Sequence, residues 1–301
     1  MSESEARVLT SRVAVWIAAI RPKTLTAAVS PVLVGTAMAW DAGGFHAAAA
    51  VCALVCALLV QIGTNLSNDY ADFLKGADTS ERKGPLRVVQ AGLLSATTVR
   101  RAASLVFFFA FICGLYLIVR GGVPALIIAV ASILSGILYT TGRWSLAYLG
   151  LGDIFVLVFF GPVAVGGTFY VQTLSINGIV LTAGLATGLL ACAILVINNV
   201  RDIEEDRQAG KKTLVVRLGR RFGIGFWAAC VVLAAIIPLE LLVATGEHRW
   251  AATSILILIP ALYVFDRLRS ETEPTALNQL LGYTAMLLLL HSVFFSVGWI
   301  L

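Results

Sequence analysis

Nine apolar runs alternate with short polar segments along this chain, and each is about as long as a membrane-spanning helix. A helix needs roughly 20 mostly apolar residues to cross the hydrocarbon core of a bilayer. The pattern therefore predicts an all-helical integral membrane protein with nine spans. Trp16 to Ile20, before the first run, is expected to form an interfacial helix. The runs cover residues 24–40, 47–66, 99–119, 124–141, 151–171, 177–199, 223–243, 250–266 and 277–300.

The positions of the basic residues predict how these spans are oriented across the membrane. Of the 22 lysines and arginines, all but Arg120 and Arg249 precede the first run or follow the second, fourth, sixth or eighth run. Lysine and arginine accumulate in the cytoplasmic loops of membrane proteins. The distribution therefore predicts a cytoplasmic N-terminus and a C-terminus on the opposite side, and an arrangement with eight spans would mix the two sides.

Composition supports a membrane protein and excludes other classes. The chain of 301 residues is 59% hydrophobic and 13% charged, whereas a soluble domain has about 25% charged residues. The net charge of +5 does not indicate nucleic-acid binding, because the basic residues lie between the spans. No cleavable signal sequence is expected. We predict one membrane domain, residues 24–301, after an N-terminal arm, residues 1–23, with cytoplasmic loops at 67–98 and 200–222.

Two polar segments at the cytoplasmic ends of apolar runs carry the chemistry. Their asparagines and aspartates are three or four residues apart, so many of them share a helix face. Carboxylates at the mouth of an apolar bundle repel one another and are costly to desolvate. Oxygen ligands of this kind suit Mg²⁺, which in turn binds diphosphates. The first segment contains Asn65, Asn68, Asp69, Asp72 and Asp78, and the second contains Asn198, Asp202 and Asp206.

Basic and aromatic residues near these segments are predicted to bind the other parts of a prenyl diphosphate. Phenylalanines below the mouth, such as Phe155 and Phe159, would line a cavity for an isoprenoid tail and stabilise an allylic cation. Asp153 is equally compatible with interface anchoring and with function. The cations expected to contact a diphosphate are Lys75, Arg143, Arg201, Lys211 and Lys212. The cations interpreted as solvated residues that fix topology are Arg82, Lys83, Arg87, Arg217, Arg220 and Arg221.

These motifs resemble those of the UbiA-type intramembrane prenyltransferases. That family has an NDxxDxxxD motif after its second helix and a DxxxD motif after its sixth. Asn68 to Asp72 matches the start of the first motif, but Gly76 replaces its last aspartate and Asp78 comes two residues later. Asp202 to Asp206 matches the second motif in full. Tyr139 and Arg143 match the Tyr-x-x-x-Lys/Arg pattern that follows the fourth helix of the family.

Softer matches resemble the family members that prenylate 1,4-dihydroxy-2-naphthoate. They are Arg21-Pro-Lys-Thr24, Gly150-Leu-Gly-Asp153, Asn198-Asn-Val-Arg-Asp202, the segment from Asp206 to Leu214, and Leu277 to Ala285. The resemblance implies nine helices around a central cavity, capped on the cytoplasmic side of the cell membrane. It also implies Mg²⁺-dependent transfer of a polyprenyl group from polyprenyl diphosphate to the naphthoate, with loss of CO₂ and diphosphate, giving demethylmenaquinone. No obligate protein partner and no nucleic acid are implied.

The resemblance also implies roles for individual residues. Asp69, Asp72, Asp202, Asp206 and Arg143 would be catalytic. The Mg²⁺ ligands would be Asn68, Asp69, Asp72, Asp78, Asn198, Asp202 and Asp206. The substrate contacts would be Lys75, Tyr139, Arg143, Arg201, Lys211 and Lys212, with Arg21 and Lys23 as candidates for the carboxylate of the acceptor.

Two alternatives stay open from the sequence. The first is the same chemistry on another acceptor, such as 4-hydroxybenzoate, homogentisate, a chlorophyllide or haem. The second is a secondary transporter that uses the acids as cation sites. Transporter sites usually lie near the middle of the membrane on broken helices, whereas these acids follow the ends of apolar runs.

Overall fold

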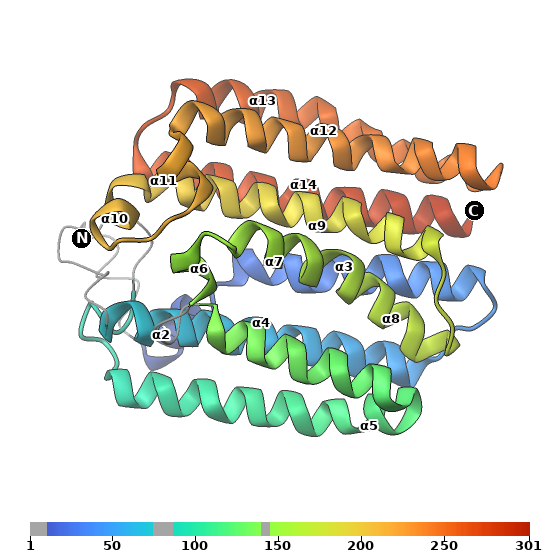
Figure 1. Ribbon diagram of the computed structural model, residues 1–301, viewed down its shortest axis with the longest axis horizontal. Coiled ribbons are helices and arrows are strands. Elements are labelled where there is room, and N and C mark those ends of the chain that lie inside the picture. Colours follow the sequence, from blue (N-terminus) through green and yellow to red (C-terminus); the bar gives the residue numbers. More distant parts are fainter. Residues whose placement is uncertain (1–10, 75–86, 140–144) are drawn as a thin grey trace.

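A computed structural model describes residues 11–74, 87–139 and 145–301, and every regular element within these ranges is helical (Figure 1). The first four elements are α2 (Arg12–Ile20), α3 (Pro22–Asp41), α4 (Ala47–Leu74) and α5 (Ala96–Leu138). The middle of the chain forms α6 (Leu146–Leu149), α7 (Gly152–Val158), the π-helical turn η1 (Phe159–Val163), α8 (Ala164–Thr173) and α9 (Gly178–Arg201). The last elements are α10 (Ile203–Gln208), α11 (Leu214–Leu218), α12 (Arg220–Thr245), the 3₁₀ segment η2 (Arg249–Ile257), α13 (Leu258–Ser270) and α14 (Pro274–Ile300).

The helices that could cross a membrane agree with a multi-pass protein. Within the described ranges seven qualify by length and apolarity, or eight if α2 and α3, bent by 49°, form one broken span. One of the seven, α5, is interrupted at Gly122, whose φ of 65° and ψ of −148° suit glycine. Figure 1 shows the two limbs of α5 running in opposite directions. The all-helical membrane architecture is confirmed, and the count of nine spans stays a prediction.

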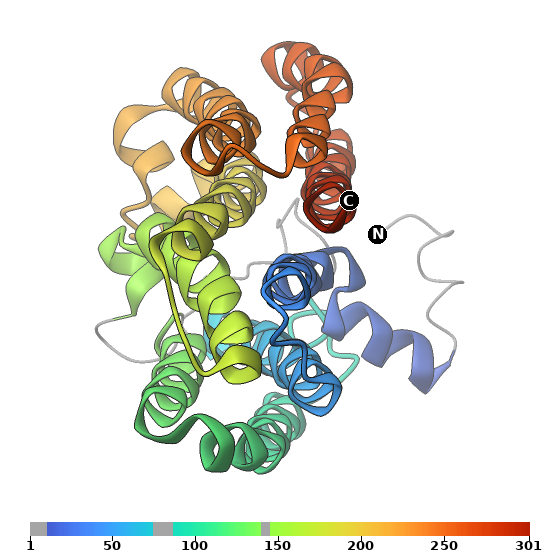
Figure 2. The same cartoon turned by 90° about the vertical axis from the view of Figure 1, so that its right-hand side faces the viewer.

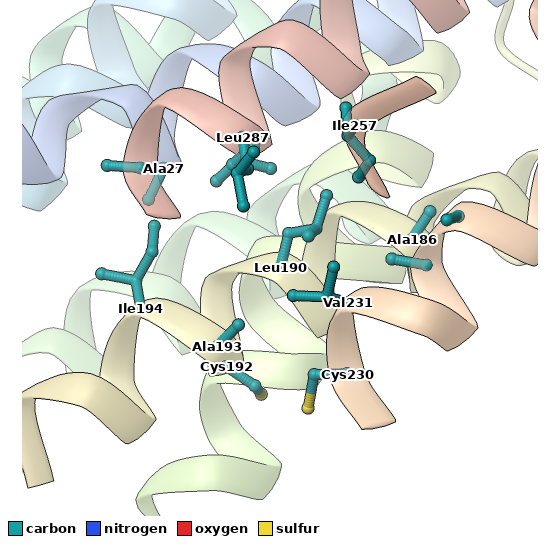
Figure 3. Close-up of a cluster of buried hydrophobic side chains, with 14 of the residues drawn as sticks. Ala27, Ala186, Leu190, Cys192, Ala193, Ile194, Cys230, Val231, Ile257 and Leu287 are labelled. Carbon is teal, nitrogen blue, oxygen red and sulfur yellow. The ribbon is translucent and has the colours of Figure 1, made fainter. Parts of the chain in front are cut away.

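The buried centre of the bundle is α9, which packs against α12, α14, α7 and η1. Small and branched apolar residues of α9 interlock there with those of its neighbours, as Leu190 and Ala193 do near Val231 (Figure 3). Cys192 and Cys230 are free thiols within this core. Large apolar side chains on the outside of α5, such as Phe108 and Phe109, are exposed, as expected of surfaces that face lipid.

Two glycines let α9 approach the kinked helix beside it. A Cβ built on Gly188 would lie 2.3 Å from the carbonyl oxygen of Leu157, and one on Gly184 would lie 2.8 Å from the Cα of Pro162. Pro162 lies inside η1 and has no N–H to continue the helical hydrogen bonds. The Oγ1 of Thr187 on α9 donates instead to the carbonyl of Phe160 at 2.9 Å. The kink is thus held by contacts with α9.

The fold gathers several short helices and the ends of both acidic segments at one end of the bundle. The C-terminal end of α4 lies there with α6, α10 and α11, whereas the C-terminus of α14 lies at the opposite end (Figure 1). The predicted helix at Trp16 to Ile20 forms part of α2. Seen along their axes, the long helices form a single bundle (Figure 2).

Candidate active site

The first acidic segment lies on α4, which stays helical as far as Leu74. The predicted loop at 67–98 therefore begins inside this helix. Asp69 and Asp72 are 1% and 2% exposed. The Oδ2 of Asp69 accepts a hydrogen bond from the backbone N–H of Val88 at 3.1 Å. The Oδ2 of Asp72 accepts one from Arg87 at 3.0 Å, so Arg87 and Val88 lie beside the acidic end of α4.

Asn65 has a structural contact that the sequence did not predict. Its Nδ2 donates to the carbonyl of Ile20 at 2.8 Å and to the Oγ1 of Thr24 at 3.0 Å. These two acceptors flank Arg21, a non-glycine residue with a φ of 57° between α2 and α3. Asn65 therefore fixes the bend between these helices, and it also lies on the wall of the apolar cavity described below.

The second acidic segment crosses the junction between α9 and α10. A continuous helix was expected to align Asn198, Asp202 and Asp206. Asp202 instead separates the two helices, with a φ of −98° and a ψ of 16°. Two backbone hydrogen bonds continue across the junction, from the N–H of Asp202 to Asn198 at 3.0 Å and from the N–H of Asp206 to Asp202 at 2.8 Å. The spacing of four residues therefore keeps its register despite the break.

Arg201 holds this junction together. Its guanidinium donates to both carboxylate oxygens of Asp202, at 2.6 and 2.7 Å. The same group donates to the side-chain oxygens of Asn198 at 2.6 Å and Asn278 at 3.2 Å. Arg201 was predicted to contact diphosphate; the structure places it in an ion pair that orients Asp202, away from the walls of both cavities. Asn278 links this pair to α14, a contact that the sequence gave no reason to expect.

Lys211 joins the two acidic segments. Its Nζ lies 3.0 Å from Oδ1 of Asp206 and 3.7 Å from Oδ2 of Asp72. Burial raises the pKa of Asp206, the charges of Asp202 and Asp72 raise it further, and Lys211 opposes the shift. Burial alone would lower the pKa of Lys211, but Asp72 and Asp206 outweigh it and the pKa is raised. Lys211 therefore stays charged between two acids that are far apart in sequence.

A polar cavity of about 70 Å³ lies between these segments. It adjoins a larger apolar cavity of about 370 Å³, whose walls include Phe155, Phe159 and Phe160. The rings of Phe155 and Phe159 stack with centroids 5.8 Å apart. The two cavities share five lining residues, namely Arg21, Asn68, Tyr139, Leu195 and Asn198. A charged head group and a hydrocarbon tail could thus occupy adjoining spaces.

The polar cavity offers oxygen ligands that fit Mg²⁺. Its walls include the carboxylates of Asp72 and Asp206 and the amides of Asn68 and Asn198. The buried Oδ1 of Asp72 has no hydrogen-bond partner among the residues that the structure describes. In the described part of the chain, no three acidic, histidine or cysteine side chains converge as one metal cluster. The donors are hard oxygens arranged on two sides of the cavity, a set suited to Mg²⁺ rather than to softer metals.

The other predicted residues divide into three groups. Arg21 and Tyr139 line both cavities. Lys23 and Lys212 are exposed and line neither cavity; the Lys23 side chain lies beside Gly282 of α14. Lys75, Asp78 and Arg143 lie outside the described residues.

Two of the cations interpreted as solvated are placed otherwise. Arg87 is 7% exposed, pairs with Asp72 and lines the polar cavity. Arg220 donates to the carbonyls of Leu268 and Glu271 at the end of α13. Asn199 and Thr213 also line the polar cavity; both fall within matched segments of the sequence, but neither was predicted to have a role in the site. Those matches, and the position of Asn199 directly after Asn198, were the available signals.

Comparisons with known proteins identify the family of this chain. A model of the UbiA prenyltransferase family matches residues 28–295. The chain is 38% identical to a 1,4-dihydroxy-2-naphthoate octaprenyltransferase of Escherichia coli (strain K12), covering 96% of each chain. It is 36% identical to the protein of the same name from Haemophilus influenzae, covering 97% of each chain. A solved structure of a UbiA homolog from Archaeoglobus fulgidus bound to GPP and Mg²⁺ superposes with a TM-score of 0.64 at 15% identity, over 94% of this chain and 99% of that one. The chain belongs to the UbiA prenyltransferase family.

Proposed function

We propose that this protein transfers a polyprenyl group from polyprenyl diphosphate to 1,4-dihydroxy-2-naphthoate in menaquinone synthesis. Both relatives named above carry this activity in their names and match almost the whole chain. The allylic C–O bond breaks and its electron pair leaves with diphosphate. A ring carbon forms the new C–C bond, and the carboxylate departs as CO₂. The product is demethylmenaquinone in its quinol form, so the reaction needs no oxidant.

The observation that carries this proposal is the junction of the two cavities between the aspartate segments. A prenyl diphosphate has a highly charged head and an apolar tail. The polar cavity, with Lys211 and Arg87 on its walls, suits the head. The apolar cavity, with the stacked rings of Phe155 and Phe159, suits the tail. The bond that breaks would then lie near the shared wall, where Tyr139 contributes to both spaces.

The chain's own residues would hold and neutralise the diphosphate. The ammonium of Lys211 and the guanidinium of Arg87 supply positive charge, and aromatic faces beside the allylic carbon stabilise its positive charge. Bound Mg²⁺ supplies further charge neutralisation of the departing diphosphate. The residues that would hold Mg²⁺ are Asn68, Asp69, Asp72, Asn198, Asp202 and Asp206, together with Asp78. Lys75 and Arg143 stay predicted diphosphate contacts.

Purified protein in lipid nanodiscs provides the direct test. We expect labelled prenyl diphosphate to be transferred to dihydroxynaphthoate, and not to 4-hydroxybenzoate or homogentisate. Carboxyl-labelled acceptor should release CO₂, and a chelator should abolish turnover until Mg²⁺ is restored. Absence of transfer to dihydroxynaphthoate, with transfer to another acceptor, would contradict the assignment. Substrate flux across liposomes without release of diphosphate would favour a transporter instead.

Single alanine substitutions test the aspartate segments. We expect Asp72→Ala and Asp202→Ala each to reduce Mg²⁺-dependent turnover by at least about a thousandfold, because each removes an oxygen ligand from a site that depends on preorganised charge. Thermal melting in nanodiscs should show that both variants stay folded. Near-normal turnover in either variant would refute the role of that segment.

A further inference from the structure

Asp153 is a buried carboxylate on the wall of the polar cavity that belongs to neither aspartate segment. It is 6% exposed and is the second residue of α7. Among the described residues, its buried Oδ1 has no hydrogen-bond partner and Asp153 forms no ion pair. Burying an unpaired carboxylate costs free energy. A side chain kept in this state therefore indicates a partner that arrives with a ligand.

The two other acids of the described chain that line this cavity, Asp72 and Asp206, already have cations, and so does Asp202, which lines neither cavity. Asp72 is paired with Arg87 and Lys211, Asp206 with Lys211, and Asp202 with Arg201. A diphosphate would be drawn toward these cations and repelled by a lone carboxylate. The region around Asp153 thus suits a different part of the substrates, one that donates hydrogen bonds.

The position of α7 indicates which part of the substrates would lie beside Asp153. Asp153 lies at the polar end of the helix and lines the polar cavity, whereas Phe155 and Val156, two and three residues later, line the apolar cavity. A group held by Asp153 would therefore lie next to the allylic end of a prenyl chain in the apolar cavity. An aromatic acceptor must occupy this place for its ring carbon to form the new bond.

We propose that Asp153 accepts a hydrogen bond from a ring hydroxyl of the aromatic acceptor and so orients the ring toward the allylic carbon. This inference rests on the proposed function. In its ionised form a carboxylate accepts hydrogen bonds and donates none, so a phenolic hydroxyl would match an ionised Asp153. The hydrogen bond also pushes electron density into the ring that attacks. Because the acceptor's own carboxylate is repelled by Asp153, it would point away, toward Arg21 at the junction of the cavities.

A site that leaves a polar group unpaired without the right ligand discriminates strongly against acceptors that lack the hydroxyl. Asp153 would then contribute to acceptor specificity as well as to orientation. Tyr139, whose hydroxyl lies near Gly152, closes the same side of the cavity.

The test compares Asp153→Asn with Glu204→Gln. The control makes the same change of carboxylate to amide at a side chain that is 69% exposed and pairs with Arg207 at the surface. We expect Asp153→Asn to lower kcat/KM for dihydroxynaphthoate by about tenfold, because the amide oxygen can still accept the hydrogen bond but without the added strength of a charged acceptor. The KM for prenyl diphosphate should change less than about twofold. In the absence of Mg²⁺, Asp153→Asn should also bind dihydroxynaphthoate about tenfold more weakly than the wild type does, as measured by quenching of tryptophan fluorescence. Glu204→Gln should match the wild type in each measurement.

Monomethyl ethers of the acceptor separate hydrogen bonding from a purely structural role. For the ether that blocks the contacted hydroxyl, wild type and Asp153→Asn should bind the acceptor equally weakly. For the other ether, the difference between the two proteins should persist. If Asp153→Asn fails to fold, Asp153→Ser is tested with the same expectations.

Several outcomes would overturn the proposal. They are unchanged acceptor binding in the variant, an equal loss of binding with both ethers and the parent diol, or a rise in the KM for prenyl diphosphate instead. A wild type that transfers no prenyl group to dihydroxynaphthoate would instead refute the proposed function, so the two failures are distinguishable.

Discussion

Arg87 and Arg207 each form an ion pair with an acid of the polar segments, but in different surroundings. Arg87 lies 3.0 Å from Asp72, and both side chains are buried; Arg207 lies 2.8 Å from Glu204, and both are exposed. Exposed pairs contribute little because water screens them. Removing one partner of a buried pair leaves the other charge uncompensated. The same interaction therefore has different consequences in the two places.

Glutamine substitutions test this difference. We expect Arg87→Gln to raise the KM for prenyl diphosphate by about tenfold or more, because it removes a charge from the cavity wall and leaves Asp72 with Lys211 alone. Arg207→Gln should leave both kinetic constants within about twofold of the wild type. Steady-state kinetics on both variants give the measurement. Equal effects of the two substitutions would exclude a special role for Arg87.

At the residue scale, the sequence predicted the acids better than their partners. The four-residue spacing correctly placed Asp202 and Asp206 on one polar stretch, because side chains four residues apart share a helix face, but only Asp206 lines the polar cavity, and Asp202 is paired with Arg201. Arg87 could not be identified in the same way, since its burial depends on a tertiary contact with Asp72. Lys211 was predicted as a diphosphate contact, but its position between Asp72 and Asp206 follows from tertiary structure alone.

The contact between α9 and the kinked helix beside it depends on glycine. No side chain larger than hydrogen fits at Gly188, because the carbonyl oxygen of Leu157 already occupies the place of a Cβ. That carbonyl belongs to α7, the same helix that carries Asp153 and Phe155. Forcing α9 and α7 apart would therefore disturb both the packing of the bundle and the wall of the site.

A pair of glycine substitutions tests this contact. We expect Gly188→Ala to destabilise the protein by about 1–3 kcal/mol, the usual cost of overpacking, and to lower turnover. Gly225→Ala on α12 is the control, because nothing lies within 4 Å of its Cβ; it should leave the Tm equal or slightly higher, since alanine favours helix. Thermal unfolding in the same detergent measures both. A Tm for Gly188→Ala equal to that of the control would contradict close packing.

At the element scale, apolar length predicted where the helices lie but not how they bend. The run at 151–171 corresponds to α7, η1 and α8, yet its π-helical turn around Pro162 was not predicted. The run at 250–266 begins as the 3₁₀ segment η2. The hydrophobicity of a run indicates that it is buried in lipid or protein. It gives no information on the hydrogen bonds that stabilise a local π-helical turn, such as that of Thr187 to Phe160.

At the scale of the whole molecule, the residues of the candidate site lie at one end of the helical bundle. The α10 and α11 region lies at one end of the bundle, and the C-terminus of α14 lies at the other (Figure 1). The alternation of basic loops along the sequence predicted this separation, because each span reverses the direction of the chain. Composition could not predict the two cavities, since their volumes depend on how the helices pack.

Which end faces the cytoplasm is a prediction that labelling can test. We expect a cytoplasmic active site in the cell membrane, because the basic residues accumulate at the end that carries the aspartate segments. The five native cysteines are replaced by alanine or serine, and single cysteines are introduced as Glu204→Cys and Glu247→Cys. Both native side chains are well exposed, at 69% and 78%. Glu204 lies on α10, at the end of the bundle that carries the aspartate segments. Glu247 follows α12, at the opposite end.

A membrane-impermeant thiol reagent then reads the orientation. In intact cells, or spheroplasts if an outer membrane is present, the cysteine at 247 should be labelled and the cysteine at 204 protected. In inverted membrane vesicles the pattern should reverse, because the cytoplasmic face is then outside. The arginine-rich loops favour this orientation, since moving that many cations across the membrane is costly. The opposite pattern would place the aspartate segments outside the cytoplasm and contradict the prediction.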